Sequence, residues 1–108
     1  MDCVFCKIIN KELPAKLLYK DEDAIVFPDL SPVKPVHLLI VPKKHIEDFI
    51  LVDDPSLFSK LFSVVQRMVE REGLKDRGFR IVVNGGGAQL VEHFHIHLMG
   101  PIEKTAKL

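Results

Sequence analysis

Three histidines near the carboxyl end of the chain alternate with apolar residues, as His93-Phe94-His95-Ile96-His97. Side chains in a β-strand point alternately to its two faces. A strand over residues 91–99 would therefore place all three imidazoles on one side, about 6.6 Å apart along the strand. The apolar residues between them would face the core. The pattern predicts a strand that carries imidazole chemistry on one face.

Three interpretations of this histidine cluster are open. The imidazoles could form a plain polar surface or satisfied core positions, or they could bind a catalytic metal, since His-x-His on a strand suits zinc. Glu92 would point to the opposite face of the strand, so no carboxylate that activates a metal-bound water is evident. We favour direct imidazole chemistry. A neutral imidazole is a good nucleophile near pH 7, and its neighbours can exchange protons with a substrate.

A glycine-rich segment, Asn84-Gly85-Gly86-Gly87, comes shortly before the histidines. Glycines let backbone N–H groups approach an anion closely. No Gly-Lys-Ser/Thr follows, so the segment is not a Walker loop. It is either a flexible hairpin turn or a phosphate-binding loop, and its position beside the histidine strand favours phosphate binding.

Cys3 and Cys6 form a Cys-x-x-Cys pair and are the only cysteines. They could be two small buried side chains. A redox pair is less favoured, because no βαβ context surrounds them. The functional interpretation is half of a closed, structural zinc site, which needs two further ligands from elsewhere in the chain.

The chain has 108 residues and equal numbers of acidic and basic side chains, 15 of each. This length predicts a single domain over residues 1–108. The balanced charge argues against a non-specific nucleic-acid binder. No apolar run is long enough for a membrane helix, and the amino terminus does not resemble a signal peptide, so we expect a cytoplasmic protein.

The first part of the chain predicts a short helix followed by three strands. Apolar spacing indicates the helix over residues 3–10. Residues 16–20 and 24–27 read as an antiparallel hairpin around a polar turn. Three prolines make residues 28–35 a loop, and residues 37–41 form the third strand.

The second part predicts one long helix and two strands. Asp54 and Pro55 mark the helix start, and Gly73 marks its end. Two adjacent apolar stripes run along it: Leu57, Leu61, Val64 and Met68, then Phe58, Phe62, Val65 and Val69. Strands follow at 79–83 and 91–99. The fold class is α+β, with a five-stranded, mostly antiparallel sheet. One stripe would cover this sheet, and the other suits a partner subunit.

The segment from Gln89 to Met99 matches the histidine-triad signature, and the chain resembles the histidine triad (HIT) family over nearly its whole length. Further segments resemble the purine nucleoside phosphoramidase branch of that family. They are Phe5-Cys6-Lys7-Ile8-Ile9, Glu12-Leu13-Pro14-Ala15-Lys16, Phe27-Pro28-Asp29-Leu30-Ser31-Pro32, Pro35-Val36-His37 and Val41-Pro42-Lys43-Lys44-His45.

The resemblance implies a homodimeric hydrolase of purine nucleotides that releases a nucleoside monophosphate through a nucleotidyl-histidine. His95 would attack phosphorus, His97 would assist the leaving group, and His37 would orient them and relay protons together with His93. Asp29 would bind the ribose hydroxyls. The base pocket would comprise Phe5, Leu13 and Phe27, and the phosphate contacts Asn84, Gly86 and Gly87, with Gln89 and His97 also binding substrate.

The resemblance also implies that a structural zinc is held by Cys3, Cys6, His45 and His93, as in many bacterial relatives. Two departures from the family pattern are visible. Leu90 stands where many members carry serine, and only four residues separate Asn84 from Gln89. The departures favour an alternative function, a zinc-stabilised nucleotide-binding or interaction module with little catalysis.

Overall fold

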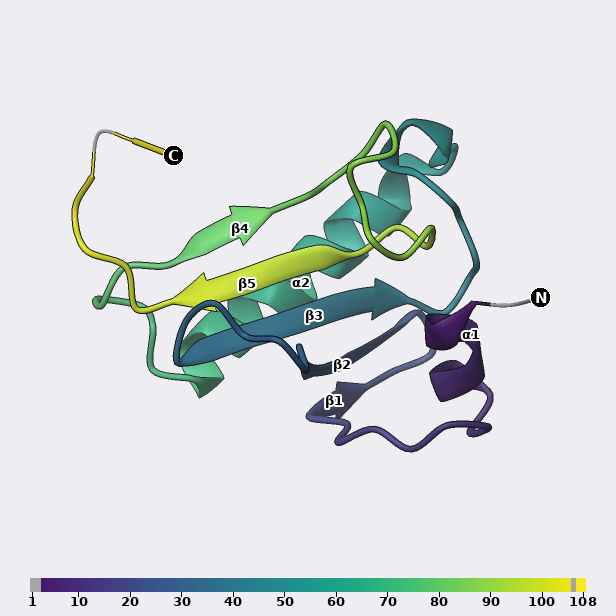
Figure 1. The fold of residues 1–108 in the computed structure, drawn as a ribbon, viewed down its shortest axis with the longest axis horizontal. Helices are drawn as coiled ribbons and strands as arrows, with labels where there is room; N and C mark the ends of the chain where they lie inside the picture. The colour runs from purple at the N-terminus through teal and green to yellow at the C-terminus, as the bar shows by residue number, and fades with distance from the viewer. Residues whose placement is uncertain (1–2, 106) are drawn as a thin grey trace.

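The computed structural model describes residues 3–105 and 107–108. Five antiparallel strands form one sheet in the order β1-β2-β3-β5-β4, with the long helix α2 behind the sheet and the short helix α1 at one end (Figure 1). The strands are β1 Tyr19–Lys20, β2 Ala24–Pro28, β3 Val36–Pro42, β4 Arg80–Val82 and β5 Ile96–Gly100. The helices are α1 Val4–Ile9, a 3₁₀ turn Phe49–Leu51 (η1) and α2 Pro55–Arg71. The predicted α+β class and five-stranded sheet are confirmed.

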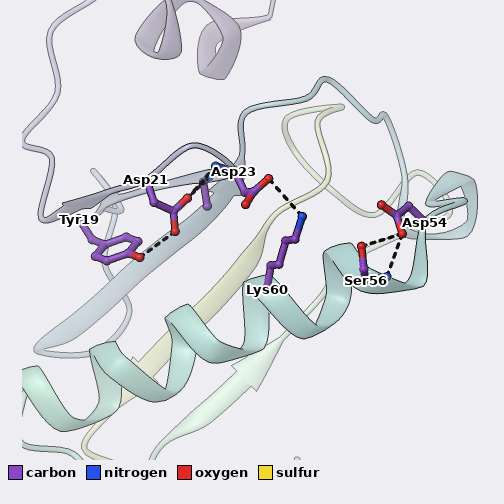
Figure 2. A network of polar contacts seen from close by, with 7 residues as sticks. Tyr19, Asp21, Asp23, Asp54, Ser56 and Lys60 are labelled. Carbon is purple, nitrogen blue, oxygen red and sulfur yellow. Dashed lines mark hydrogen bonds and ion pairs between the residues drawn. The ribbon is translucent and has the colours of Figure 1, made fainter.

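The ends of α2 follow the local signals in the sequence. The Asp54 side chain accepts hydrogen bonds from the backbone N–H of Ser56 at 3.0 Å and from its hydroxyl at 2.8 Å (Figure 2). Gly73 adopts a φ of +69° directly after the C-cap residue Glu72, a conformation that glycine reaches without strain. The predicted helix start and end are confirmed.

The turn between β1 and β2 is held by Asp21 and tied to α2. The Asp21 carboxylate accepts hydrogen bonds from the N–H groups of Asp23 and Ala24, and the Tyr19 hydroxyl donates to it at 2.7 Å. Lys60 of α2 lies 3.6 Å from Asp23, so the helix contacts the turn across the sheet edge (Figure 2). The polar turn predicted here is therefore also a contact point for the long helix.

Two apolar clusters occupy the two faces of the sheet. The cluster facing α2 includes Phe94, Ile96 and Leu98, as predicted, together with helix residues Leu61 and Met68. The cluster on the opposite face comprises Cys3, Phe5, Ile25, Phe27, Leu39 and Val41. Helix α1 therefore covers part of the face that α2 leaves open, and this second face carries the histidines His37 and His97.

The predicted strand at 91–99 is wrong in its first half, since β5 begins only at Ile96. Residues 91–95 are irregular because tertiary contacts replace strand pairing there. The backbone N–H of Phe94 donates to the carbonyl of Ile46 at 2.6 Å, and the His93 ring contacts the carbonyl of Pro42 at 2.8 Å. The three imidazoles therefore do not share one strand face. Smaller differences shorten the predicted strand 16–20 to two residues and extend 37–41 by one residue at each end.

The second apolar stripe of α2 is only partly covered. Phe62 is 44% exposed and lies in a groove of about 720 Å³ that it shares with Val65, Val69, Phe79 and Ile81. Strand β4 borders this groove and is the last strand of the sheet, so one of its edges is unpaired within the described residues. In those same residues, no helix has both the length and the apolarity needed to span a membrane.

Candidate functional site

Strands β3 and β5 bring His37 and His97 together on the face away from α2. His97 is the register partner of Leu39, and Leu39 and His37 share a face because they are two residues apart. The Nε2 of His37 lies 2.9 Å from the Nδ1 of His97. Two imidazoles that are 60 positions apart in the sequence are thus in direct hydrogen-bond contact.

The hydrogen bonds of His37 fix the proton positions on both rings. The backbone N–H of Val33 donates to the Nδ1 of His37 at 3.1 Å, so this nitrogen is unprotonated and Nε2 carries the proton. Nε2 then donates to the Nδ1 of His97. The proton of a neutral His97 is therefore on its Nε2, where it can be donated to a bound ligand.

His95 has the opposite tautomer. Its Nδ1 donates to the backbone carbonyl of His93 at 2.7 Å, so the proton resides on Nδ1 and the lone pair on Nε2. The His95 ring lies 4.9 Å from the His97 ring between centroids. The site consequently combines an unprotonated imidazole nitrogen with a neighbouring imidazole N–H donor.

Burial keeps these imidazoles neutral. Burial lowers the pKa of His95, against a smaller opposing effect of the hydrogen bond to the His93 carbonyl. Burial also lowers the pKa of His97 to about 4, and the adjacent His95 and His37 rings act in the same direction. Both rings are therefore uncharged at neutral pH in the free protein, which keeps the Nε2 lone pair of His95 available as a nucleophile.

Two buried aromatic rings flank the nucleophile candidate. The Phe5 ring from α1 lies edge-on to His95 with centroids 5.0 Å apart, and to Phe27 at 5.6 Å. Leu13, the third residue predicted to line a base pocket, is 39% exposed and lies outside both core clusters. The structure therefore brings Phe5 and Phe27 together beside His95 but does not bring Leu13 into their cluster.

Asp29 directly follows β2, and its carboxylate lies close to His37 and His97. One carboxylate oxygen, Oδ2, lies 3.5 Å from the Nε2 of His37 and 4.0 Å from the Nδ1 of His97. The other, Oδ1, accepts the backbone N–H of Ser31 at 2.8 Å. A carboxylate held beside the imidazoles is placed to accept hydrogen bonds from a ligand's hydroxyl groups.

The glycine loop makes contacts that the sequence did not indicate. The N–H of Gly86 donates to the Oδ2 of Asp48 at 2.8 Å, and the N–H of Gly87 donates to the side chain of Gln89 at 3.1 Å. Gln89 is buried and also donates to the carbonyl of Glu47 at 3.1 Å. The two backbone N–H groups predicted to hold a phosphate are thus already engaged by side chains.

Leu90, which departs from the family pattern, and Asn84, at the start of the short glycine loop, both lie at the surface. Asn84 is exposed, and Leu90 is 99% exposed, so its side chain contributes nothing to the packing of the loop.

Asp48 is the residue that sequence reasoning missed. Its carboxylate also accepts the N–H of Ile50 at 3.2 Å, which makes it a link between η1 and the glycine loop. A single acidic residue 38 positions before its partner gives no sequence signal.

A second cluster groups the four predicted metal ligands. One ligand atom from each of Cys3, Cys6, His45 and His93 lies within 4.8 Å of the others. The Nδ1 of His93 is 3.3 Å from the sulfur of Cys3, and the Nδ1 of His45 is 3.3 Å from that of Cys6. Two thiols and two imidazoles form the donor set of a tetrahedral zinc site, so these residues fit the ion.

The proton positions of this cluster also suit a metal. The Nε2 of His93 donates to the carbonyl of Pro42, so its Nδ1 lone pair faces the thiols. Burial, with the hydrogen bond to Cys3 adding to it, raises the pKa of Cys6 to about 11. Both cysteines are free thiols. A bound metal would have to displace their protons.

Comparisons with known proteins agree on the family. The family model described as the HIT domain matches residues 10–104. The chain is similar to Protein HitA of Neisseria gonorrhoeae, with 39% identity over 103 residues that cover 92% of this chain and 95% of that protein.

Solved structures give the same result for the fold. A HIT family hydrolase from Legionella pneumophila superposes with a TM-score of 0.91 and 38% identity, covering 98% of each chain. A histidine triad protein from Clostridium difficile gives a TM-score of 0.90 and 38% identity, covering 97% of this chain and 95% of that one.

Proposed function

The chain belongs to the HIT family, and from this premise we propose that it hydrolyses purine nucleoside phosphoramidates to a nucleoside monophosphate and an amine. Dinucleoside polyphosphates would be slower substrates. The observation that carries the proposal is the hydrogen bond from the Nδ1 of His95 to the carbonyl of His93, which leaves Nε2 free to attack. The HIT family hydrolase from Legionella pneumophila supports the reaction class.

The reaction would proceed in two displacements. The anionic substrate would bind together with one proton, which gives the His37–His97 pair a positive charge. The Nε2 of His95 then forms a bond to phosphorus as the P–N bond to the leaving amine breaks, and the amine nitrogen takes a proton from the Nε2 of His97, which leaves the pair neutral. Water then attacks the phosphorus of the nucleotidyl-histidine, transfers a proton to His97 and releases the monophosphate. A covalent intermediate divides one difficult displacement into two easier ones.

The nucleoside would bind on the side of the imidazoles formed by α1 and β2. The Phe5 and Phe27 rings would contact the purine face, with Leu13 at the pocket margin, and Asp29 would accept the ribose hydroxyls. Apolar walls suit a flat purine, and a carboxylate suits a vicinal diol. Phe5 and Phe27 would thus select a purine base, and the Asp29 carboxylate would select ribose over deoxyribose.

The phosphate would contact His97, Asn84 and the glycine loop. Because the N–H groups of Gly86 and Gly87 are engaged by Asp48 and Gln89, the phosphate must displace these side chains to use them. This observation favours a second candidate function, a nucleotide-binding module with little turnover. Hydrolysis distinguishes the two candidates, because a binding module retains monophosphate affinity without consuming substrate.

We further propose that Cys3, Cys6, His45 and His93 hold a structural zinc. The ion would anchor α1, and with it Phe5, to the body of the domain, and it takes no part in the chemical steps. The two free thiols also suit the reducing environment of the cytoplasm, which is the location we propose.

The partner would be a second copy of the chain. The exposed apolar groove of α2 and β4 and the unpaired edge of β4 together support a homodimer that joins two such faces. Replacing Phe62 by glutamate should give a monomer in light scattering, whereas Lys20→Glu, at the other edge of the sheet, should remain dimeric. A monomeric unmodified protein would refute the dimer.

The enzymatic proposal is tested with a tryptamine adenosine phosphoramidate. The unmodified protein should release adenosine monophosphate, and rapid quenching followed by mass spectrometry should detect a nucleotidyl adduct on His95. The His95→Ala variant should keep monophosphate binding and lose turnover by at least about a thousandfold. Undiminished turnover by this variant would remove His95 as nucleophile, and binding without turnover by the unmodified protein would favour the module.

A further inference from the structure

A groove rich in cationic side chains lies at the end of the sheet where β5 finishes and β4 begins. Its volume is about 640 Å³, and its charged lining residues are Lys34, Arg77, Arg80, Lys104 and Glu103. Four cations and one carboxylate give a local excess of positive charge in a chain whose net charge is zero. Such an excess attracts an anion.

None of the four cations forms an ion pair with another described residue. Among residues 3–105, 107 and 108, the ion pairs are His37 and His97 with Asp29, Lys60 with Asp23, and Arg71 with Glu72. None involves a cation of the groove. Their charged groups can therefore pair with an anionic ligand.

Arg80, which lines the groove, lies on the face of the sheet that carries the imidazoles. Arg80 is the register partner of Met99, which lies two residues after His97 on β5, and Val82 is the partner of His97. Arg80 and His97 therefore share a face as diagonal neighbours, a relation that places Cβ atoms about 7–8 Å apart. His37 is also paired with Met99, from the other side.

The direction of the proposed displacement leads toward this groove. In an in-line displacement at phosphorus, the leaving group departs on the side opposite the nucleophile. Along the chain, His95 precedes β5, His97 lies within it, and Met99 with its neighbour Arg80 lies beyond. A leaving group that is opposite His95 and assisted by His97 therefore points to Arg80.

We propose that the groove at Arg80 is a binding site for the leaving group and selects amines that carry a carboxylate. The inference rests on the proposed hydrolase function. The Arg80 guanidinium can pair with a carboxylate through two parallel hydrogen bonds, and Lys34 and Arg77 add positive charge around it. The preferred substrates would be adenosine phosphoramidates of short amino acids.

Two matched substrates test this selection, the adenosine 5′-phosphoramidates of β-alanine and of β-alaninamide. They differ in the leaving group by one negative charge. The unmodified protein should favour the carboxylate in kcat/KM by about fivefold at low salt, since an exposed charge pair contributes up to about that factor. The preference should shrink as ionic strength rises.

Substitutions in the groove test whether its cations cause the preference for the carboxylate substrate. Arg80→Gln and Lys34→Gln should each bring the ratio of the two kcat/KM values toward one, while Lys20→Gln, at the far edge of the sheet, should leave it unchanged. Two groove variants are used so that a folding defect in one of them does not decide the result.

The outcomes separate the inference from the proposed function. Equal hydrolysis of both substrates by the unmodified protein would overturn the leaving-group site while retaining the hydrolase. If neither substrate is hydrolysed and the tryptamine phosphoramidate is not hydrolysed either, the hydrolase is refuted, and calorimetric binding of the two β-alanine compounds decides the inference. Tighter binding of the carboxylate compound that depends on Arg80 supports the site, and equal binding of the two overturns it.

Discussion

The Nε2 of His37 lies 2.9 Å from the Nδ1 of His97, and this contact gives His37 a defined task. Because Val33 donates to the other nitrogen of His37, the His37–His97 bond keeps the proton of His97 on its outer nitrogen. The pair therefore holds a proton donor ready for a leaving group, whereas His95 is set up separately by the His93 carbonyl.

Replacing His37 by alanine should slow the departure of basic leaving groups selectively. Without the His37 donor, the tautomer of His97 that protonates the amine is no longer enforced. We expect kcat to fall about a hundredfold for an alkylamine phosphoramidate. It should fall much less for an arylamine of low basicity, which needs little protonation to leave.

His37→Gln provides the matched control, since its amide N–H can still donate toward His97. Partial recovery of the alkylamine rate is expected from this variant. Equal losses on both substrates in the alanine variant would show that His37 has only a structural role.

Asp29→Asn should weaken the binding of ribonucleotides but spare their 2′-deoxy counterparts. The carboxylate oxygen beside His37 is the one that would accept the ribose hydroxyls, and the asparagine carbonyl can still accept the N–H of Ser31. A hydrogen bond to a charged group corresponds to roughly a tenfold or larger change in affinity. Calorimetric titration with both monophosphates measures it, and equal losses would remove Asp29 from the ribose site.

Removal of zinc should lower the stability of the fold but should not directly abolish turnover. The protein should contain about one zinc per chain by elemental analysis. Cys6→Ser should lose the metal and lower the melting temperature by about 10 °C or more. Lys7→Ala, on the same helix but outside the cluster, should keep both the metal and the stability.

A chelator distinguishes a structural zinc from a catalytic one. Chelated protein that stays folded should still turn over substrate, because the proposed steps use only His95 and His97. Loss of turnover from a folded, metal-free protein would place the metal in the reaction. Protein that contains no metal after purification without chelator would contradict the zinc site.

Local signals in the sequence were sufficient for much of the fold. The Asp54 cap, Pro55 and Gly73 act on their own neighbourhood, so the ends of α2 could be predicted. The alternation of Phe94, Ile96 and Leu98 with histidines identified correctly which side chains face the core. The same alternation gave a wrong strand at 91–95, because contacts with Ile46 and Pro42 override the local pattern there.

The candidate site could not be predicted from local signals, because it is formed by contacts between segments that are distant in the sequence. The pairing of His37 with His97 spans 60 positions, and the grouping of Cys3 with His93 spans 90. Periodicity does not encode such contacts, so they were expected only from the family resemblance. Asp48 belongs to none of the motifs that carry the resemblance, so its hydrogen bond with the N–H of Gly86 could not be anticipated.

Acid should destabilise the protein through His97. Burial lowers the pKa of His97 to about 4 in the folded state, against about 6.5 in an unfolded chain. Between these values the unfolded state binds more protons than the folded state, so the free energy of unfolding falls as the pH falls from 6.5 to 4. A shift of this size corresponds to a contribution of about 3 kcal/mol, present above pH 6.5 and lost below pH 4.

Urea unfolding of the unmodified protein and of His97→Asn, at several pH values between 7 and 4, measures this contribution. The other titrating groups, including the cluster histidines, are common to both proteins and cancel in the difference between them. The variant should therefore lose less stability than the unmodified protein over this range. Parallel curves for the two proteins would mean that His97 titrates alike in the folded and unfolded states, and that its ring is not held neutral beside His37.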